Sequence, residues 1–429
     1  MKSVAWRLVV AVLLAGASAG PARAQDTGRA GDAGLVAADS LVASWVDARR
    51  VPGAVLLVVR DGEVVLEKAY GWRSAYAFAH GEYGLSAAGR SDPDAVRPVE
   101  PPDAMTPTTA FDLASVTKVM ATTLAIMLLV DRGAVALDEP VSTYLPDFTG
   151  GGKEAITVRH LLTHTSGLLQ WVPTYYHASD PDGAYAYVRD LPLGWPVGEG
   201  RHYSDLGFMV LGRVVEAASG RGLDAFLREE LYGPLGLGRT GFRPGDVPAG
   251  GLPPGPFAAT SHGNPYEHRM VHDSTFGYRI SGDPDAWDGW RRRTLVAEVN
   301  DGNAWHAWRG VAGHAGLFST ARELGVLLQL LLDGGRGGGR RYVSSETVEA
   351  FLAPQLPGQA LGWQVPDYAP EGSFVHTGFT GTYVLGVPAR RLAVVLLTNR
   401  QNGGLDGRGL YPDVGGLQRG VAEGVVGGR

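Results

Sequence analysis

Ser115 and Lys118 stand three positions apart at the start of a long apolar segment. Residues three apart on a helix lie on the same face, so the amine of Lys118 can reach the hydroxyl of Ser115. A serine hydroxyl is a poor nucleophile until a base takes its proton, and a lysine removed from water can be neutral enough to help. The pair predicts a nucleophile that attacks acyl groups. A serine N-cap followed by a surface lysine is the structural alternative.

The setting of Lys118 favours the chemical interpretation. Lysine occurs in the chain only at Lys2, Lys68, Lys118 and Lys153. Residues 115–130 are apolar nearly all round, which is typical of a buried helix. The N-terminus of such a helix also favours negative charge that develops nearby. Scarcity and an apolar setting together favour a role for Lys118 beyond that of a surface cation.

Two β-hairpins are predicted near opposite ends of the chain. Residues 54–59 and 63–69 flank Asp61-Gly62, a pair that supplies the positive φ angles of a tight turn. Residues 382–387 and 392–398 form the second pair. The simplest packing joins both hairpins in one antiparallel sheet that is flanked by helices, with a mostly helical lobe inserted. The predicted fold class is therefore α+β.

The same pattern predicts how the chain is divided. The sheet lobe would contain about residues 35–110 and 310–429, and the helical lobe about residues 115–300. Residues 74–108 are rich in Pro, Asp, Gly and Ala, and residues 242–300 are rich in Gly and Pro. Neither segment has clean periodicity, so both are interpreted as long loops that shape a cleft.

Several motifs carry a resemblance to a known family. Residues 111–118, Phe-Asp-Leu-Ala-Ser-Val-Thr-Lys, resemble the nucleophile segment of the serine β-lactamase-like hydrolases. That family includes class C β-lactamases, penicillin-binding-protein-like peptidases and related esterases. Residues 51–54, 156–168, 313–320 and 397–400 also fit, in the family's order. The combination is specific for the superfamily, implies a serine β-lactamase/transpeptidase-like fold, and says little about the substrate.

The family's second motif, Tyr-x-Asn, is Tyr203-Ser204-Asp205 in this chain. The resemblance implies that Tyr203 shares the general-base role with Lys118 and later protonates the leaving group. A phenol has a pKa near 10, so it needs a neighbouring cation to lower it, and Lys118 is the candidate. Asp205 departs from the usual Asn. Its carboxylate would hold Lys118 charged and favour Tyr203 as the proton acceptor, or it would only cap the following helix.

The family's third motif, Lys-Thr-Gly, is replaced by His376-Thr377-Gly378. The resemblance implies that His376 lines the site and that the backbone N–H groups of Ser115 and Phe379 form the oxyanion hole. Gly378 would let the substrate backbone approach the strand. Histidine is mostly neutral above about pH 6.5, so it is a weaker anchor for a substrate carboxylate than lysine. Esterase or D-aminopeptidase-type activity thus competes with β-lactamase or carboxypeptidase activity.

The other candidate residues, all histidines or tryptophans, are expected to have mainly structural roles. His160 and His164 have the i, i+4 spacing of metal ligands, but the glutamate that a zinc protease needs is missing, so no metal or other cofactor is predicted. A structural role beneath the active site is expected for both. His314 is interpreted as a turn or packing residue, with cleft lining as the alternative. Three tryptophans would pack or flank a substrate groove: Trp171, Trp305 and Trp308.

The N-terminal residues predict export. Lys2 and Arg7 give a positive start, residues 8–14 are apolar, and Ala22-Arg23-Ala24 is a cleavage site of the A-x-A type. Residues 1–24 are therefore interpreted as a signal peptide and residues 25–429 as one hydrolase domain. A retained anchor is the alternative, but the run is short against the roughly 18 residues that a spanning helix needs. The mature chain is predicted to be periplasmic or secreted, without stable membrane insertion.

Composition narrows the function classes. The formal charge of −6 gives no reason to expect nucleic acid, and the absence of cysteine excludes thiolate nucleophiles and disulfides. The sequence therefore predicts an exported serine hydrolase that uses an acyl-enzyme on a β-lactam, an ester or a D-amino-acid peptide or amide. The expected partner is a small-molecule or peptidoglycan-derived substrate. A non-catalytic protein that binds cell-wall fragments on the same fold is the alternative.

Overall fold

The computed structural model of the chain describes residues 33–79, 96–277 and 282–427. The predicted signal peptide, residues 1–24, lies outside the described residues. In the described part of the chain, no helix is both long and apolar enough to cross a membrane.

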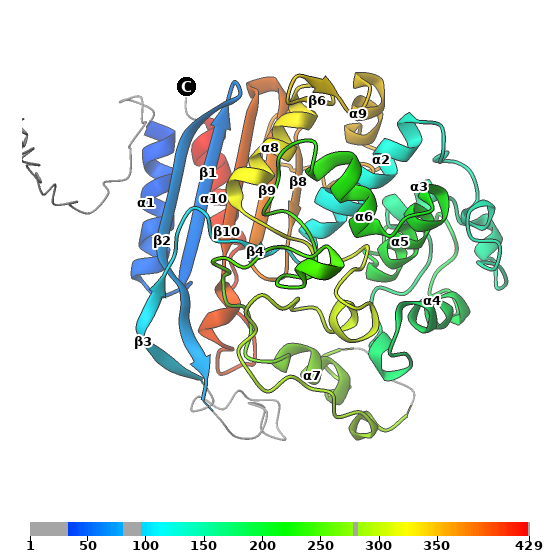
Figure 1. Cartoon of the computed structure of the whole chain (residues 1–429), viewed down its shortest axis with the longest axis horizontal. Coiled ribbons are helices and arrows are strands. Elements are labelled where there is room, and N and C mark those ends of the chain that lie inside the picture. The colour runs from blue at the N-terminus through cyan, green and yellow to red at the C-terminus, as the bar shows by residue number, and fades with distance from the viewer. Residues whose placement is uncertain (1–32, 80–95, 278–281, 428–429) are drawn as a thin grey trace, which may run out of the picture.

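One antiparallel sheet of six strands forms the centre of the molecule, in the order β3-β2-β1-β10-β9-β8 (Figure 1). The strands are β1 (Gly53–Arg60), β2 (Glu63–Phe78), β3 (Val96–Ala104), β8 (Phe374–Thr377), β9 (Thr382–Val387) and β10 (Leu392–Thr398). β1 pairs with β10, so Ala54 lies opposite Thr398 and the two ends of the chain meet in mid-sheet. The predicted sheet of N- and C-terminal strands is confirmed.

Both predicted hairpins are present, but the predicted loop over 74–108 is wrong in part. Asp61 and Gly62 have φ angles of 52° and 80°, as the tight turn between β1 and β2 requires. β2 continues to Phe78, where it pairs with Val96 of β3; residues 80–95 lie outside the described residues. This ribbon extends beyond the core and most of β3 is exposed, so it lacks the alternation of a half-buried strand.

Helices cover both faces of the sheet. α1 (Ala33–Asp47) and α10 (Gly415–Gly427) pack on one face, where Leu56 and Val58 point. α8 (Ala321–Leu332) packs on the other, and Gly325 lets it approach Leu57 closely. Because β1 is covered on both faces, its sequence is apolar nearly throughout and does not alternate between apolar and polar residues.

The remaining helices pack beyond α8, on the same side of the sheet (Figure 1). The predicted buried helix over 115–130 is confirmed as a wide π-helical turn (Lys118–Thr123) that continues into α2 (Leu124–Asp131). Such turns are frequent at functional sites. The other α-helices of the described residues are α3 (Val158–Leu162), α4 (Pro181–Asp190), α5 (Asp205–Ser219), α6 (Leu223–Leu227), α7 (Pro265–His272) and α9 (Ser345–Leu352). The division into a sheet lobe and a helical lobe at the predicted boundaries stays a prediction.

Candidate active site

Ser115 lies in a tight turn directly before the buried helix. The short strand β4 (Phe111–Asp112) enters the turn and pairs with β5 (Phe318–Ser319). Ala114 has a φ of 45°, and its N–H donates to Asp112 Oδ1 at 2.8 Å. Asp112 Oδ2 accepts the Asn300 N–H at 2.5 Å. The buried carboxylate of Asp112 thus stabilises the positive φ angle of Ala114, the residue directly before the serine.

Lys118 is fully buried and lies within hydrogen-bond distance of the serine. Its Nζ donates to Ser115 Oγ at 3.1 Å and to the carbonyl oxygen of His314 at 3.1 Å. Asp205 Oδ1 lies 2.6 Å from the same Nζ. Burial alone would lower the pKa of Lys118, but the charge of Asp205 and the contact with Tyr203 outweigh burial and raise it. The resting amine is therefore an ammonium ion, paired with a carboxylate.

Asp205 is free to pair with Lys118 because a neighbour caps the helix. Ser204 Oγ accepts the Gly207 N–H at 3.1 Å and is the N-cap of α5. Asp205 is the first residue of that helix, where a negative charge is also favoured by the helix dipole. Of the two roles predicted for Asp205, the structure places it against Lys118 rather than at the cap.

Tyr203 completes the cluster, and its hydroxyl is within hydrogen-bond reach of both Ser115 and Lys118. Burial raises its pKa; the Lys118 charge lowers it, but by less, so the net direction is upward. Lys118 therefore lowers this pKa, as expected, but burial, which the sequence does not show, outweighs its effect. The phenol keeps its proton at rest and can donate it.

His164 packs against the ring of Tyr203, which is the structural role predicted for it. The ring centroids of the two residues are 4.5 Å apart, and His164 Nδ1 accepts the Ser204 N–H at 3.0 Å. Burial holds the pKa of His164 well below its usual value, so the ring is neutral. His160 instead forms a capping box with Thr157 at the start of α3, away from the serine.

The His376-Thr377-Gly378 segment forms the end of β8 and the turn after it. His376 is buried, its Nδ1 donates to the Thr377 carbonyl oxygen at 2.8 Å, and burial lowers its pKa to about 3. It is a neutral ring at physiological pH. A Cβ on Gly378 would lie 2.4 Å from the Leu113 carbonyl oxygen. The glycine therefore admits the nucleophile turn; its role in letting the substrate backbone approach the strand stays a prediction.

Two backbone N–H groups near the serine, those of Ser115 and Phe379, come from different elements. In the part of the chain that the structure describes, neither Ser115 nor Phe379 donates its N–H to another residue. Both residues line the same cavity. The guanidinium group of Arg400 donates to the Phe379 carbonyl oxygen at 2.9 and 2.6 Å and fixes that turn. Such an arrangement suits an oxyanion hole.

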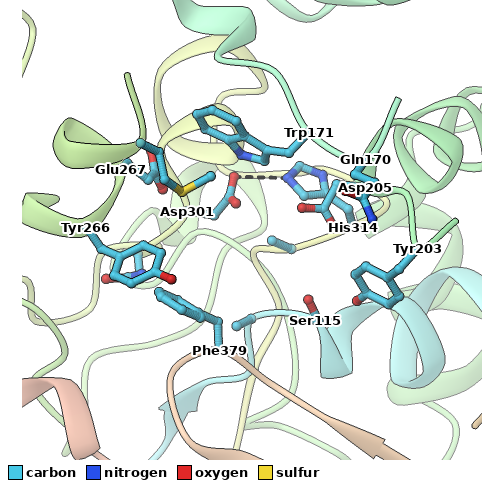
Figure 2. Close-up of a pocket in the computed structure, with 14 residues that line it drawn as sticks. Ser115, Gln170, Trp171, Tyr203, Asp205, Tyr266, Glu267, Asp301, His314 and Phe379 are labelled. Atoms are coloured by element: carbon cyan, nitrogen blue, oxygen red, sulfur yellow. Dashed lines mark hydrogen bonds and ion pairs between the residues drawn. The ribbon is translucent and has the colours of Figure 1, made fainter. Parts of the chain in front are cut away.

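Two cavities meet at the serine, and both are lined by Ser115, Tyr203 and Phe379. The first, of about 290 Å³, lies between α7 and the start of α5 (Figure 2). Its further lining consists of Ala114, Gln170, Trp171, Asp205, Tyr266, Glu267, Met270, Asn300, Asp301, His314 and Ala315. The second, of about 340 Å³, is lined further by Gln364, His376, Thr377, Gly378, Arg400, Asp413, Val414, Gly415 and Gln418.

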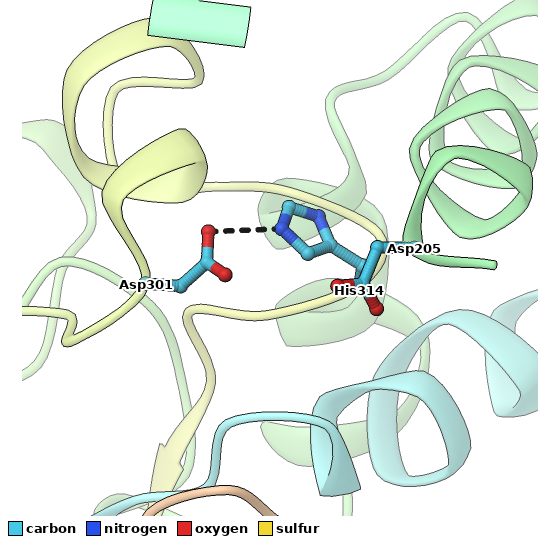
Figure 3. A group of neighbouring side chains, drawn as sticks. All are labelled: Asp205, Asp301 and His314. Atoms are coloured by element: carbon cyan, nitrogen blue, oxygen red, sulfur yellow. Dashed lines mark hydrogen bonds and ion pairs between the residues drawn. The ribbon is translucent and has the colours of Figure 1, made fainter. Parts of the chain in front are cut away.

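Asp205, Asp301 and His314 come close together at the edge of the first cavity (Figure 3). Each offers one atom that could coordinate a metal, within 4.8 Å of the others. Asp205 is already paired with Lys118 at 2.6 Å, and Asp301 Oδ1 accepts from His314 Nε2 at 2.9 Å. A metal ion would have to displace these partners, so we assign none.

The sequence predicted cleft lining as the alternative role of His314, which does line the first cavity, but it did not single out Glu267 and Asp301. Glu267 and Asp301 belong to or adjoin the aperiodic segment 242–300, where no pattern singles out a residue. The run Asn300-Asp301-Gly302-Asn303 was the available signal. Of the three tryptophans, Trp171 lines the cavity and Trp308 is buried, while Trp305 lies under the Arg291 guanidinium.

Comparison with known proteins identifies the family. The Beta-lactamase family model matches residues 38–414, and the chain belongs to this family of serine hydrolases, with the β-lactamase/transpeptidase-like fold. It is 34% identical over 377 residues to the N-acetylmuramyl-L-alanine amidase of Bacillus subtilis (strain 168), covering 82% of this chain and 78% of that protein.

Two further proteins are similar over most of their length. A putative D-alanyl-D-alanine carboxypeptidase of Salmonella agona (strain SL483) is 29% identical over 402 residues, or 88% of this chain and 85% of that one. The octameric penicillin-binding protein homologue from Pyrococcus abyssi superposes with a TM-score of 0.63 at 21% identity, over 92% of this chain and 78% of that chain. The latter likeness concerns the fold alone.

Proposed function

We propose that this serine hydrolase is exported and cleaves an amide bond in a peptidoglycan-derived fragment, through an acyl-enzyme on Ser115. The observation that carries the proposal is the convergence of Ser115, Lys118, Tyr203 and Asp205 where two cavities meet. Two relatives named for cell-wall amide or peptide hydrolysis support the substrate class. The positive and apolar N-terminal residues support export.

Acylation begins when Ser115 Oγ attacks the amide carbonyl. The serine proton passes to Lys118, which gives one of its own protons to Asp205, 2.6 Å away. Because the ammonium–carboxylate pair is neutral overall, this relay moves protons without creating net charge in a buried site. The N–H groups of Ser115 and Phe379 stabilise the oxyanion that forms.

The tetrahedral intermediate collapses when the leaving amine is protonated. Tyr203 keeps its proton at rest, so it is the group that can donate to the amine nitrogen as the carbon–nitrogen bond breaks. Lys118 then returns a proton to Tyr203, and Asp205 returns its proton to Lys118. Water attacks the acyl-enzyme through the same relay and frees Ser115.

The neutral His376 favours amide cleavage over β-lactam and D-alanyl-D-alanine hydrolysis. A lysine at this place would be a permanent partner for a substrate carboxylate, and a ring with a pKa of about 3 is not. β-Lactam and D-alanyl-D-alanine hydrolysis, which rely on that carboxylate, are therefore less favoured than cleavage of an amide that is recognised through its acyl half. A purely binding protein is also disfavoured, because two relatives are named as hydrolases and Lys118 lies within reach of both Ser115 and Asp205.

The proposal is tested with a fluorescent fluorophosphonate probe and a substrate panel. We expect the probe to label the wild type and not Ser115→Ala. We expect N-acetylmuramyl-L-alanine to be hydrolysed faster than nitrocefin or a D-alanyl-D-alanine peptide. An unlabelled but folded wild type contradicts the acyl-enzyme, and faster turnover of nitrocefin or the D-alanyl peptide contradicts the substrate class. Processing at Ala24 on secretion tests export.

A further inference from the structure

The first cavity offers hydrogen-bond acceptors that the protein itself does not use. Asp301 Oδ1 accepts from His314 Nε2 at 2.9 Å and from the Ala304 N–H at 2.7 Å. Its Oδ2 accepts from none of the residues that the structure describes. Figure 3 shows the carboxylate held by the imidazole, with the second oxygen turned away from it. One carboxylate oxygen therefore remains available to a ligand.

His314 provides a second, independent acceptor. Its side chain is 1% exposed and lines the first cavity, yet Nδ1 has no hydrogen-bond partner within the described ranges. With the proton on Nε2, where Asp301 accepts it, Nδ1 carries a lone pair. A buried acceptor without a partner costs free energy unless a ligand supplies the donor.

Aromatic side chains enclose these acceptors. Tyr266 and Phe379 meet edge to face with ring centroids 4.9 Å apart, and Phe379 is 37% exposed. Trp171 lies on the other side of Asp301 (Figure 2). No lysine or arginine is among the lining residues that the structure describes. The cavity thus combines acceptors with apolar ring faces.

We propose that the first cavity binds a saccharide ring, which is the acyl half of the substrate. This inference rests on the proposed function and names its substrate class. A sugar ring presents hydroxyl donors at its edge, which suit Asp301 Oδ2 and His314 Nδ1, and C–H faces that pack against aromatic rings. Tyr203, the donor to the leaving group, lies across Ser115 from Tyr266 (Figure 2), so we assign the leaving group to the second cavity, which Tyr203 also lines.

A bound ammonium group is less suited to the cavity. Asp205 is already paired with the Lys118 ammonium group, and Asp301 Oδ1 accepts hydrogen bonds from His314 Nε2 and the Ala304 N–H. The third carboxyl group, Glu267, accepts the Gly302 N–H at 2.8 Å. Burial, together with the charge of Asp301, raises the pKa of Glu267 to about 8, so it is neutral at physiological pH. The lining therefore favours a neutral ligand with many donors.

Binding of N-acetylmuramic acid to full-length Ser115→Ala protein tests the proposal, with tryptophan fluorescence as the readout. We expect saturable binding, weakened about tenfold when Asp301→Asn is added, the factor expected for one hydrogen bond to a charged group. Tyr266→Leu leaves the carboxylates in place and should also weaken binding. Glu323→Gln alters a half-buried carboxyl group bonded to Thr240, outside both cavities, and should not.

The outcomes separate this proposal from the proposed function. Absence of binding, or equal affinity in Asp301→Asn, Tyr266→Leu and the Glu323→Gln control, overturns the saccharide site. Displacement by D-alaninamide but not by N-acetylglucosamine overturns it in favour of an ammonium site. In either case, fluorophosphonate labelling of Ser115 in the wild type would still support the hydrolase. Loss of labelling with retained sugar binding would overturn the hydrolase instead.

Discussion

The two cavities that meet at Ser115 differ in how they are built and in what they present. The first is lined by Glu267 and Asp301, which lie in or next to the aperiodic segment 242–300, and by His314. The second is lined by His376 and its neighbours at the edge of the sheet, together with Arg400. The first offers acceptors and aromatic faces, and the second a neutral imidazole and a guanidinium group that is bonded to backbone carbonyls.

This difference indicates that the chemistry and the recognition of the acyl half depend on different parts of the chain. The reacting groups lie at the N-terminal ends of the buried helix and of α5, because rigid elements fix side chains precisely enough for proton transfer. The irregular segment recognises the acyl half, where loop variation changes specificity without disturbing the chemistry. Substitutions at the junction should therefore affect every substrate, whereas substitutions in one cavity should affect one half of the substrate.

The largest effect is expected at the junction itself. Lys118→Ala removes the relay between Ser115 and Asp205, and we expect acylation to slow by at least ~100-fold for esters and amides alike, as for loss of a general base. Stopped-flow acylation with p-nitrophenyl acetate measures this. Lys153, which is also buried, lines neither cavity, so Lys153→Ala is the control. A near-normal rate in Lys118→Ala would remove the lysine from the mechanism.

Gly378→Ala should disturb the junction from the second cavity. A methyl group there would meet Thr382 and the Leu113 carbonyl oxygen and push the nucleophile turn aside. We expect acylation to slow by about tenfold or more, the scale of an overpacked site. Gly407→Ala, with open space around its Cβ position, should leave the rate unchanged. Equal rates in both variants would show that the contact with Leu113 does not position the serine.

His376→Lys should change the second cavity alone. A lysine would place a cation where the neutral ring now lies, so substrates that end in a carboxylate should gain about tenfold in kcat/KM relative to their amide-capped forms. The ratio for the acid and the capped peptide is the measurement. His376→Gln, which adds no charge, should leave the ratio near that of the wild type. An unchanged ratio in His376→Lys would place the leaving group elsewhere.

The last prediction concerns the pH dependence of folding stability, not the reaction rate, and tests the first cavity. Because Glu267 has a pKa of about 8 when folded and near 4.5 when unfolded, the folded state holds an extra proton between these values. The stabilisation that protonated Glu267 gives the folded state is complete below pH 4.5 and is lost as the pH rises to about 8. Over this range the free energy of unfolding falls by on the order of 1 kcal/mol per pH unit. Melting curves from pH 5 to 8 should fall less steeply for Glu267→Gln. Parallel curves would show that Glu267 ionises normally.

The sequence predicted what depends on local patterns. Asp61-Gly62 fixes a hairpin turn within a few residues, and Ser115 and Lys118 share a helix face whatever surrounds them. It did not predict what depends on distant packing. Gly378 accommodates Leu113 from the other end of the chain, and Asp301 meets His314 only because two loops converge. The raised pKa of Tyr203 likewise reflects burial by the whole fold.

The most direct test of the account is rapid-quench mass spectrometry during hydrolysis of N-acetylmuramyl-L-alanine. If the first cavity holds the acyl half and Ser115 is the nucleophile, the intact protein gains the mass of an N-acetylmuramyl group, and peptide mapping places it on Ser115. Free L-alanine should appear in the same burst. An adduct on another residue, or one that carries the alanine instead of the sugar, would contradict the assignment of the two cavities.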